Sequence, residues 1–172
     1  MRRFIRVRAS RVLPAAVAAV TVAAVLAGCG FRLAGSQPLP AILLRPYVSL
    51  QDPYTDFSRE FERDLKGAGA DLQAVSAGAS AVVEISKDTV EQRILSVSAR
   101  NIPTEYLLVY TVTFAVHADG RELLSPQTLS LSQDYTFSEQ AVLAKEHEAD
   151  ILRQQLARNL AAIAMRRLSS LK

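Results

Sequence analysis

Cys29 is the only cysteine of the 172-residue chain, and it directly follows Leu26-Ala27-Gly28. Five arginines lie upstream, and residues 12–28 between them and the cysteine carry no charge. A basic start, an apolar middle and an exit of small residues are typical of a secretory signal. A single thiol in an exported chain cannot form an internal disulfide, so covalent modification is the chemistry that this position favours.

The small-small-Cys exit resembles the lipobox of bacterial lipoproteins, whose cysteine is acylated and becomes the first residue. We therefore expect residues 1–28 to be a cleaved signal peptide and residues 29–40 a lipidated linker. The alternative is a transmembrane anchor, but 17 residues stand at the short end of the roughly 17–25 that a bilayer span needs. In many Gram-negative lipoproteins Asp after the cysteine signals inner-membrane retention. Gly30 stands there, which implies an outer-membrane address on the periplasmic side.

Cleavage would also change the charge of the chain. The full sequence has a net charge of +3, but all five upstream arginines leave with the signal. The mature chain then keeps 15 Lys and Arg against 17 Asp and Glu, a net charge of −2. Nucleic-acid binding therefore loses its electrostatic basis.

The sequence contains no recognised catalytic or metal-binding pattern. His117 and His147 are far apart in sequence, and neither has a second ligand at the spacing of a metal site. No nucleophile-elbow, phosphate-loop, HExxH or EF-hand pattern occurs. We expect no cofactor, and a binding or assembly protein rather than an enzyme.

Residues 41–172 have the length of a single domain. A strand is predicted over residues 41–50, where Pro46 favours an edge position. A helix is predicted over residues 56–66, capped by Thr55 or Asp56, with Phe57, Phe61 and Leu65 as its apolar stripe.

The middle of the chain alternates apolar and polar residues, as strands do. Residues 71–75 are a candidate short strand, and long strands are predicted over residues 81–97, 105–117 and 123–137. Asp119-Gly120 predicts a tight hairpin turn. Thirteen residues at ~3.3 Å each make a strand of roughly 40 Å, about twice the usual length. A sheet this long could extend beyond its helices and contact another protein, or it could be simply solvated.

The last predicted element is a helix over residues 146–168. Its apolar stripe is Ile151, Leu152, Leu156, Leu160 and Ile163. Its early acidic and late basic residues complement the helix dipole; a membrane-surface helix is the alternative. The order β-α-(β)-β-β-β-α predicts an α+β two-layer sandwich, in which two helices cover a mostly antiparallel sheet of about four long strands.

Three strings occur in a particular order along the chain. They are Gly30-Phe31-Arg32-Leu33 after the lipobox, Glu105-Tyr106 opening the long strand, and Tyr135-Thr136-Phe137 followed by Ala141-Val142-Leu143-Ala144-Lys145-Glu146. Together they resemble the LptE family of lipopolysaccharide-assembly lipoproteins, over residues 29–170. Ala34 and Gln133 stand where that family commonly has arginine.

The resemblance implies a function and partners. Family members plug the barrel of the outer-membrane protein LptD, help to assemble it, and assist the insertion of lipopolysaccharide into the outer leaflet. It therefore implies an LptD-like barrel bound one to one, direct binding of lipopolysaccharide, and attachment to the outer membrane through Cys29. It also implies that Lys145, in the Leu-Ala-Lys string, and Arg100, before Glu105-Tyr106, contact lipopolysaccharide.

Other functions remain open at this point. The chain could be an auxiliary periplasmic lipoprotein of a lipid-transport ABC system, or an envelope-stability module that binds peptidoglycan. Such proteins also combine a lipobox with a small α+β domain. Stable association with a large outer-membrane barrel would distinguish the first function from these.

Overall fold

The computed structural model describes residues 38–171. Cys29, the predicted signal peptide and the Gly30-Phe31-Arg32-Leu33 string lie outside the described residues. None of the helices within residues 38–171 has the length and apolar character that a membrane span requires.

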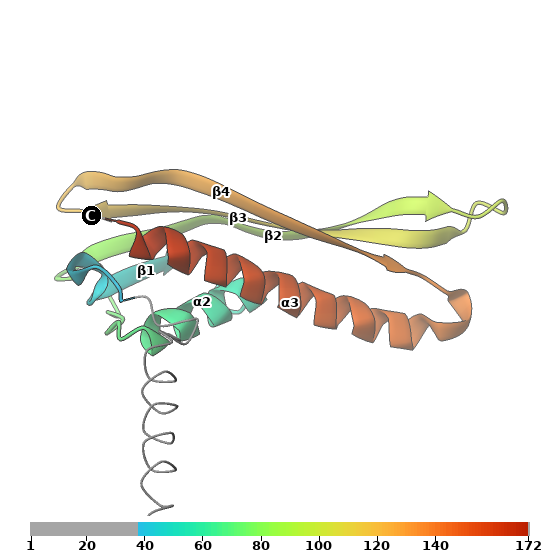
Figure 1. Ribbon diagram of the computed structural model, residues 1–172, viewed down its shortest axis with the longest axis horizontal. Coiled ribbons are helices and arrows are strands. Elements are labelled where there is room, and N and C mark those ends of the chain that lie inside the picture. The colour runs from blue at the N-terminus through green and yellow to red at the C-terminus, as the bar shows by residue number, and fades with distance from the viewer. Residues whose placement is uncertain (1–37, 172) are drawn as a thin grey trace, which may run out of the picture. The chain divides into compact units, whose positions relative to one another are not determined.

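A four-stranded mixed sheet forms one layer of the domain, and two helices form the other (Figure 1). The strands are β1 (Pro46–Leu50), β2 (Ala81–Val97), β3 (Pro103–Ala118) and β4 (Arg121–Thr136), and they lie in chain order across the sheet. β1 pairs with β2 in parallel, whereas β2, β3 and β4 are antiparallel. The helices are α2 (Asp56–Gly67) and α3 (Val142–Ser169). The predicted α+β two-layer class is confirmed.

The first predicted strand is correct only in its second half. Residues 41–43 form a short 3-10 helix, η1 (Ala41–Leu43), in which Leu43 N–H donates to the carbonyl of Pro40 at 2.8 Å. β1 then begins at Pro46 and occupies a sheet edge, as its proline predicts. The candidate strand at residues 71–75 is reduced to one bridge, between Gln73 and Tyr47.

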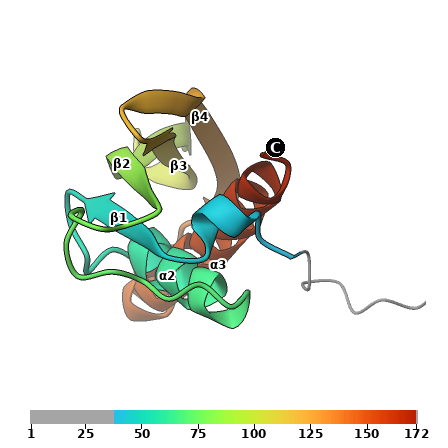
Figure 2. The same cartoon turned by 90° about the vertical axis from the view of Figure 1, so that its left-hand side faces the viewer.

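α2 forms as its sequence predicts. Thr55 is the N-cap, and its hydroxyl oxygen accepts a hydrogen bond from Ser58 N–H at 3.0 Å. Phe57, Phe61 and Leu65 are fully buried. They belong to the hydrophobic core. Figure 2, seen from the end where β1 lies, shows α2 and α3 together on one side of the sheet.

The long strands give the sheet two different faces. The inner face carries Leu108, Tyr110, Val112, Phe114 and Val116 of β3, all buried against the helices. A two-residue turn joins β3 to β4, with positive φ at Asp119 (51°) and Gly120 (71°). Near this turn an irregularity in the register brings Leu124 opposite Val116, next to Pro126. The register shift interrupts the alternation that the sequence predicted from Leu123 onward.

α3 begins four residues earlier than predicted. A short 3-10 helix, η2 (Glu139–Ala141), leads into it, and no side chain caps its N-terminus. The expected acidic residues therefore lie beyond its first turn, while Arg166 and Arg167 lie in its last. Leu156 and Leu160 of the predicted stripe are buried, but Ile151 is 48% exposed. Three alanines instead complete the buried face, namely Ala157, Ala161 and Ala164.

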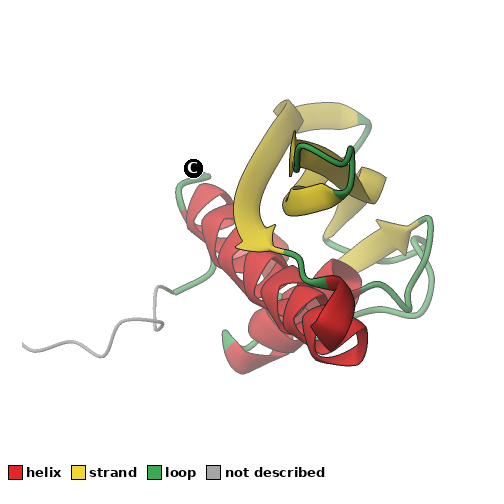
Figure 3. Ribbon diagram, turned by 90° about the vertical axis from the view of Figure 1, so that its right-hand side faces the viewer, coloured by secondary structure: helices red, strands yellow, loops and turns green. Residues whose placement is uncertain are grey.

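α3 runs along the sheet toward the end where β1 lies (Figures 1 and 3). We call residues 87–97, 103–113 and 128–136 the distal half of the sheet. β1 pairs only with residues 81–85 of β2, so it does not reach this half. The N-terminal half of α3 alone faces the inner side of the sheet near its distal end.

Candidate functional site

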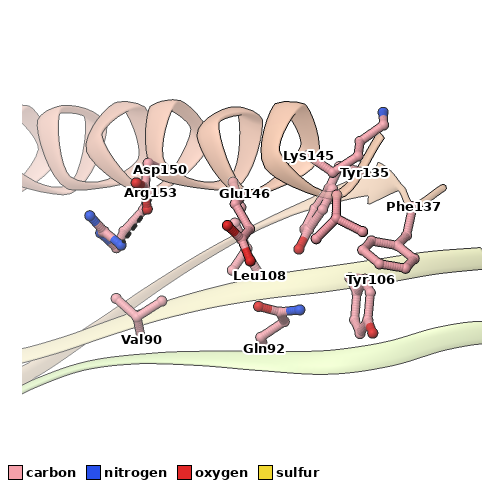
Figure 4. A pocket seen from close by; sticks show the side chains of 12 residues that line it. Val90, Gln92, Tyr106, Leu108, Tyr135, Phe137, Lys145, Glu146, Asp150 and Arg153 are labelled. Carbon is pink, nitrogen blue, oxygen red and sulfur yellow. Dashed lines mark hydrogen bonds and ion pairs between the residues drawn. The ribbon is translucent and has the colours of Figure 1, made fainter. Parts of the chain in front are cut away.

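A groove of about 540 Å³ lies between the distal half of the sheet and the first turns of α3. We call it the distal groove. Figure 4 shows Val90 and Gln92 of β2 pointing toward the helix across it. Its volume is in the range of roughly 300–1,000 Å³ that is usual for ligand sites. Its apolar and aromatic lining consists of Val90, Tyr106, Leu108, Tyr135, Phe137, Val142 and Ala149.

Three aromatic rings make the floor of the groove near the sheet end. Tyr106 and Tyr135 are cross-strand partners whose ring centroids lie 5.7 Å apart in a stacked arrangement. Phe137 meets Tyr106 edge to face at 5.3 Å. Such ring pairs contribute about 0.5–1.5 kcal/mol beyond their buried area. The aromatic string of the sequence therefore forms a packed platform rather than three separate surface residues.

The rim of the distal groove carries charges of both signs. Lys145 and Arg153 contribute the positive charges, and Glu146 and Asp150 the negative ones. Glu146 points toward the sheet (Figure 4), whereas the ammonium of Lys145 lies at the end of β4. Because the four charges balance, the rim does not select strongly for an ion of either sign.

Lys145 is held in place by two partners. Its Nζ donates to Glu148 Oε2 at 2.7 Å and to Thr136 Oγ1 at 3.1 Å, and its side chain is only 20% exposed. The pairing joins the first turn of α3 to the end of β4. An anionic ligand at Lys145 would therefore compete with, or add to, the carboxylate of Glu148.

Arg100 lies elsewhere, in the turn between β2 and β3, and is exposed. Ser98 fixes the turn: its N–H donates to Ile102 at 2.8 Å, and its carbonyl accepts from Asn101 at 2.9 Å. Asn101 adopts a positive φ of 62°. Arg100 is not among the groove-lining residues, so the structure does not bring it together with Lys145 in one cavity.

A polar cluster lies next to the distal groove, where α2, α3 and β2 meet. Arg153 Nε donates to Asp56 Oδ2 at 2.7 Å, across 97 residues of sequence. Burial opposes ionisation of Asp56, but hydrogen bonds from Arg153 and Arg59 hold the pKa of Asp56 below its ordinary value. Thr55 and Ser58 donate to Asp88 of β2.

Tyr110 connects the same cluster to the core. Its hydroxyl oxygen accepts a hydrogen bond from Phe57 N–H at 3.1 Å, in the first turn of α2. Burial raises the pKa of Tyr110 well above its ordinary value, and the neighbouring carboxylate of Asp88 adds to the shift. Sequence reasoning missed both this contact and the Asp56–Arg153 pair, because nothing local in the sequence marks partners so far apart.

The arrangement offers little for catalysis. His117 lies 3.6 Å from Glu84 with its side chain partly exposed, and His147 is exposed on α3. Among residues 38–171, no group of three or more His, Cys, Asp or Glu side chains is placed to hold a metal ion. A groove with an apolar floor and balanced charges at its rim can bind an elongated ligand.

The outer face of the sheet combines hydroxyl and charged side chains with Leu107 and Val109, and no helix or strand of the described chain covers it (Figure 3). Hydroxyl side chains pair across β3 and β4: Thr111 with Ser130 at 3.1 Å and Thr113 with Thr128 at 2.9 Å. Further along, Ser132 lies opposite Val109. This ladder makes a rigid surface with many hydrogen-bonding groups.

Comparison with known proteins places these features in context. The family model LptE, described as lipopolysaccharide-assembly, matches residues 46–168. The LPS-assembly lipoprotein LptE of Yersinia enterocolitica is 27% identical over 148 residues, which cover 84% of this chain and 70% of the relative. The crystal structure of the rare lipoprotein B from Shewanella oneidensis has a TM-score of 0.64 and 25% identity, covering 73% of this chain and 94% of that one.

A second solved structure is similar over more of the chain. The solution structure of the uncharacterized lipoprotein B from Nitrosomonas europaea has a TM-score of 0.68 and 26% identity, covering 82% of this chain and 91% of that one. The matched range of the family model begins at β1 and ends in the last turn of α3. It therefore includes the whole sheet, both α-helices and the distal groove.

Proposed function

The chain belongs to the LptE family of lipopolysaccharide-assembly proteins, and from this we propose that it is an outer-membrane lipoprotein that plugs and helps to assemble an LptD-like β-barrel. In this role it assists the insertion of lipopolysaccharide into the outer leaflet and binds lipopolysaccharide directly. The role is not enzymatic. Acylation at Cys29 anchors the chain at the periplasmic side of the outer membrane.

One observation supports the plug above the others, namely the uncovered outer face of the long sheet. The interiors of outer-membrane barrels are polar. A face that carries Thr111, Thr113, Ser130 and Ser132 satisfies part of its own hydrogen bonding and offers the remainder to a polar wall. A rigid sheet three long strands wide loses little conformational freedom when it binds, which lowers the entropic cost of association.

The association is tested by isolating the tagged full-length protein from its own membranes in mild detergent and measuring the stoichiometry of what accompanies it. We expect one equivalent of a large β-barrel protein. The variant Ser130→Glu/Ser132→Glu, which places two charges on the outer face, should reduce recovery of the barrel. Gln155→Glu, exposed on α3, is the control and should not. Isolation of the protein alone, or with an inner-membrane transporter, would contradict the plug and favour an auxiliary lipoprotein.

Lys145 and Arg100 are the proposed contacts to lipopolysaccharide. Lipid A carries phosphates, and Lys and Arg make charge-assisted hydrogen bonds to them. Both residues lie at ends of elements, at the first turn of α3 and in the β2–β3 turn. Because they do not share a cavity, we expect them to contact separate phosphates or separate parts of one molecule.

Charge reversal tests these two residues. Lys145→Glu and Arg100→Glu should each weaken binding of lipopolysaccharide by the purified mature chain, and the double variant should weaken it most. Lys66→Glu, at the exposed end of α2, is the matched control. Unchanged binding by the double variant would remove both residues from the proposed site.

A further inference from the structure

The edge of β2 is unpaired over its distal half. β1 pairs with β2 only as far as Leu50 and Ile85, and the chain then turns away toward α2. Beyond this point β2 continues to Val97, with β3 as its only strand neighbour within the described residues. Every second residue from Lys87 to Ile94 therefore directs a backbone N–H and C=O away from the sheet, and a register irregularity interrupts this alternation between Ile94 and Val97.

The length of this open edge is sufficient for a whole strand. Eleven residues at ~3.3 Å each extend for roughly 36 Å, whereas an ordinary strand has about 5–6 residues. An alternating row of amide and carbonyl groups is matched by an extended polypeptide, not by an acyl chain or a sugar. The same edge already accepts such a segment in this molecule, because β1 pairs with Ala81–Ile85.

The open edge carries four charged and four apolar side chains, and the apolar residues near its end are exposed. Ile94 is 58% exposed, Leu95 53% and Val97 50%. Sheet edges that must stay unpaired usually carry prolines, bulges or charges directed against a partner. The other edge strand, β4, is protected in this way by Pro126 and an adjacent register irregularity. The distal half of β2 contains no proline, and its charges Glu91 and Arg93 pair with each other. Its register irregularities with β3 lie at its two ends, between Ile85 and Lys87 and between Ile94 and Val97, and leave Lys87–Ile94 regular.

The distal groove lies beside this edge and on the inner face of the sheet. Val90 and Gln92 of β2 line it together with the aromatic floor. A strand added next to β2 would direct alternate side chains to opposite faces of the sheet. Those on the inner side would enter the groove against Tyr106, whose cross-strand neighbour on β2 is Ile94.

We propose that the open edge of β2, Lys87–Val97, binds an extended segment of the barrel protein by strand addition, with alternate apolar side chains of that segment in the distal groove. This inference rests on the proposed function for the identity of the partner. The backbone edge supplies the affinity, and the groove selects apolar side chains at every second position.

Photo-crosslinking in the intact complex tests the register that strand addition requires. A photoreactive residue is introduced in turn at Thr89, Glu91 and Arg93, and the crosslinked partner residues are mapped. We expect one short segment of the barrel protein, along which the crosslinks move in steps of about two residues. The same residue at Ser125 of β4 should not crosslink to that segment. Crosslinks scattered over several segments, or to a second copy of this chain, would overturn the proposal.

A pair of substitutions tests the apolar character of the site. Ile94→Lys/Val97→Lys should reduce barrel recovery at least about fivefold, whereas Leu143→Lys/Ile151→Lys, at exposed positions of α3, should leave it unchanged. A thermal unfolding midpoint equal to that of the parent protein shows that each variant is folded. If the barrel is recovered equally with both variants, strand addition is wrong and the plug stands. If no barrel is recovered with the parent protein, the proposed function itself fails.

Discussion

Removing the hydroxyl group of Tyr110 should destabilise the domain more than the loss of a single oxygen atom suggests. Tyr110 is 1% exposed and Phe57 is fully buried. The Tyr110 hydroxyl is the acceptor for Phe57 N–H, which lies in the first turn of α2 and has no partner within the helix. Tyr110→Phe keeps the ring and its packing but leaves that N–H buried and unpaired.

The expected cost follows from this unpaired group. An unsatisfied buried backbone donor costs about 1–3 kcal/mol. For a chain of this size, each kcal/mol lowers the midpoint of thermal unfolding by roughly 2–4 °C. We therefore expect Tyr110→Phe to lower the free energy of unfolding by about 2 kcal/mol at neutral pH. Tyr54→Phe is the matched control, because Tyr54 is 80% exposed.

The pH dependence gives a second measurement of the same contact. Because the folded pKa of Tyr110 lies above the ordinary value near 10, the folded state keeps the phenol proton after the unfolded state has lost it. The stability linked to this proton is complete below about pH 10 and is lost as the pH rises from there through the folded pKa. Tyr110→Phe should make the loss of stability at alkaline pH less steep. Burial also raises the pKa of Tyr135, so part of the loss should remain.

Urea unfolding of the mature chain, followed by circular dichroism from pH 7 to 11, measures both effects. A change below about 0.5 kcal/mol at pH 7, together with an unaltered alkaline slope, would refute the reasoning. It would mean that water or a small shift of α2 satisfies Phe57 N–H. A large loss in Tyr54→Phe as well would show that the effect is not specific to the buried hydroxyl.

Three further predictions concern the rest of the chain. Asp56→Asn should cost about 1 kcal/mol at neutral pH, since Asp56 pairs with Arg153 near the surface. The pKa of Asp56 is lowered in the folded state, so its contribution to the free energy of unfolding is present above about pH 4 and is lost as the pH falls through the folded pKa. Urea unfolding between pH 7 and 2 should therefore show a smaller loss of stability in acid for Asp56→Asn than for the parent protein. Leu160→Ala should cost about 2–5 kcal/mol in thermal unfolding, because Leu160 is fully buried, and a smaller cost would indicate that the core collapses around the cavity. Cys29→Ala should abolish acylation, as detected by metabolic labelling with a fatty acid, and labelling that persists would contradict the lipobox.

Local patterns in the sequence predicted most of the secondary structure. Strict alternation around Tyr110 predicted β3, and Asp119-Gly120 predicted the turn that follows it, because both depend on neighbouring residues. The boundaries that failed depend on contacts between distant segments. Residues 41–43 form a 3-10 turn instead of a strand. Ile151 is exposed because α3 packs against the core through its alanines.

The candidate site was less accessible to sequence reasoning than the fold. Lys145 is a predicted lipopolysaccharide contact only through its string, and its contacts with Thr136 and Glu148 depend on how α3 meets β4. The distal groove depends on the strand register that aligns Tyr106 with Tyr135 and on the position of α3 above them. The unpaired edge of β2 depends on the end of β1 at Leu50. Strand order was not derivable from the sequence, so neither the groove nor the edge could be predicted.

The order of the strands also has a consequence for the way the domain folds. β2, β3 and β4 are joined by short turns, so their pairing closes small loops and should occur early. α3 is the last element of the chain, and Leu156, Leu160 and Leu168 reach the core only when it docks. Until then only α2 covers the inner face, so the part that α3 would cover is open to solvent. A chain that ends before residue 142 would therefore form a β-sheet with an exposed apolar face. Such a species self-associates and is bound by chaperones and proteases.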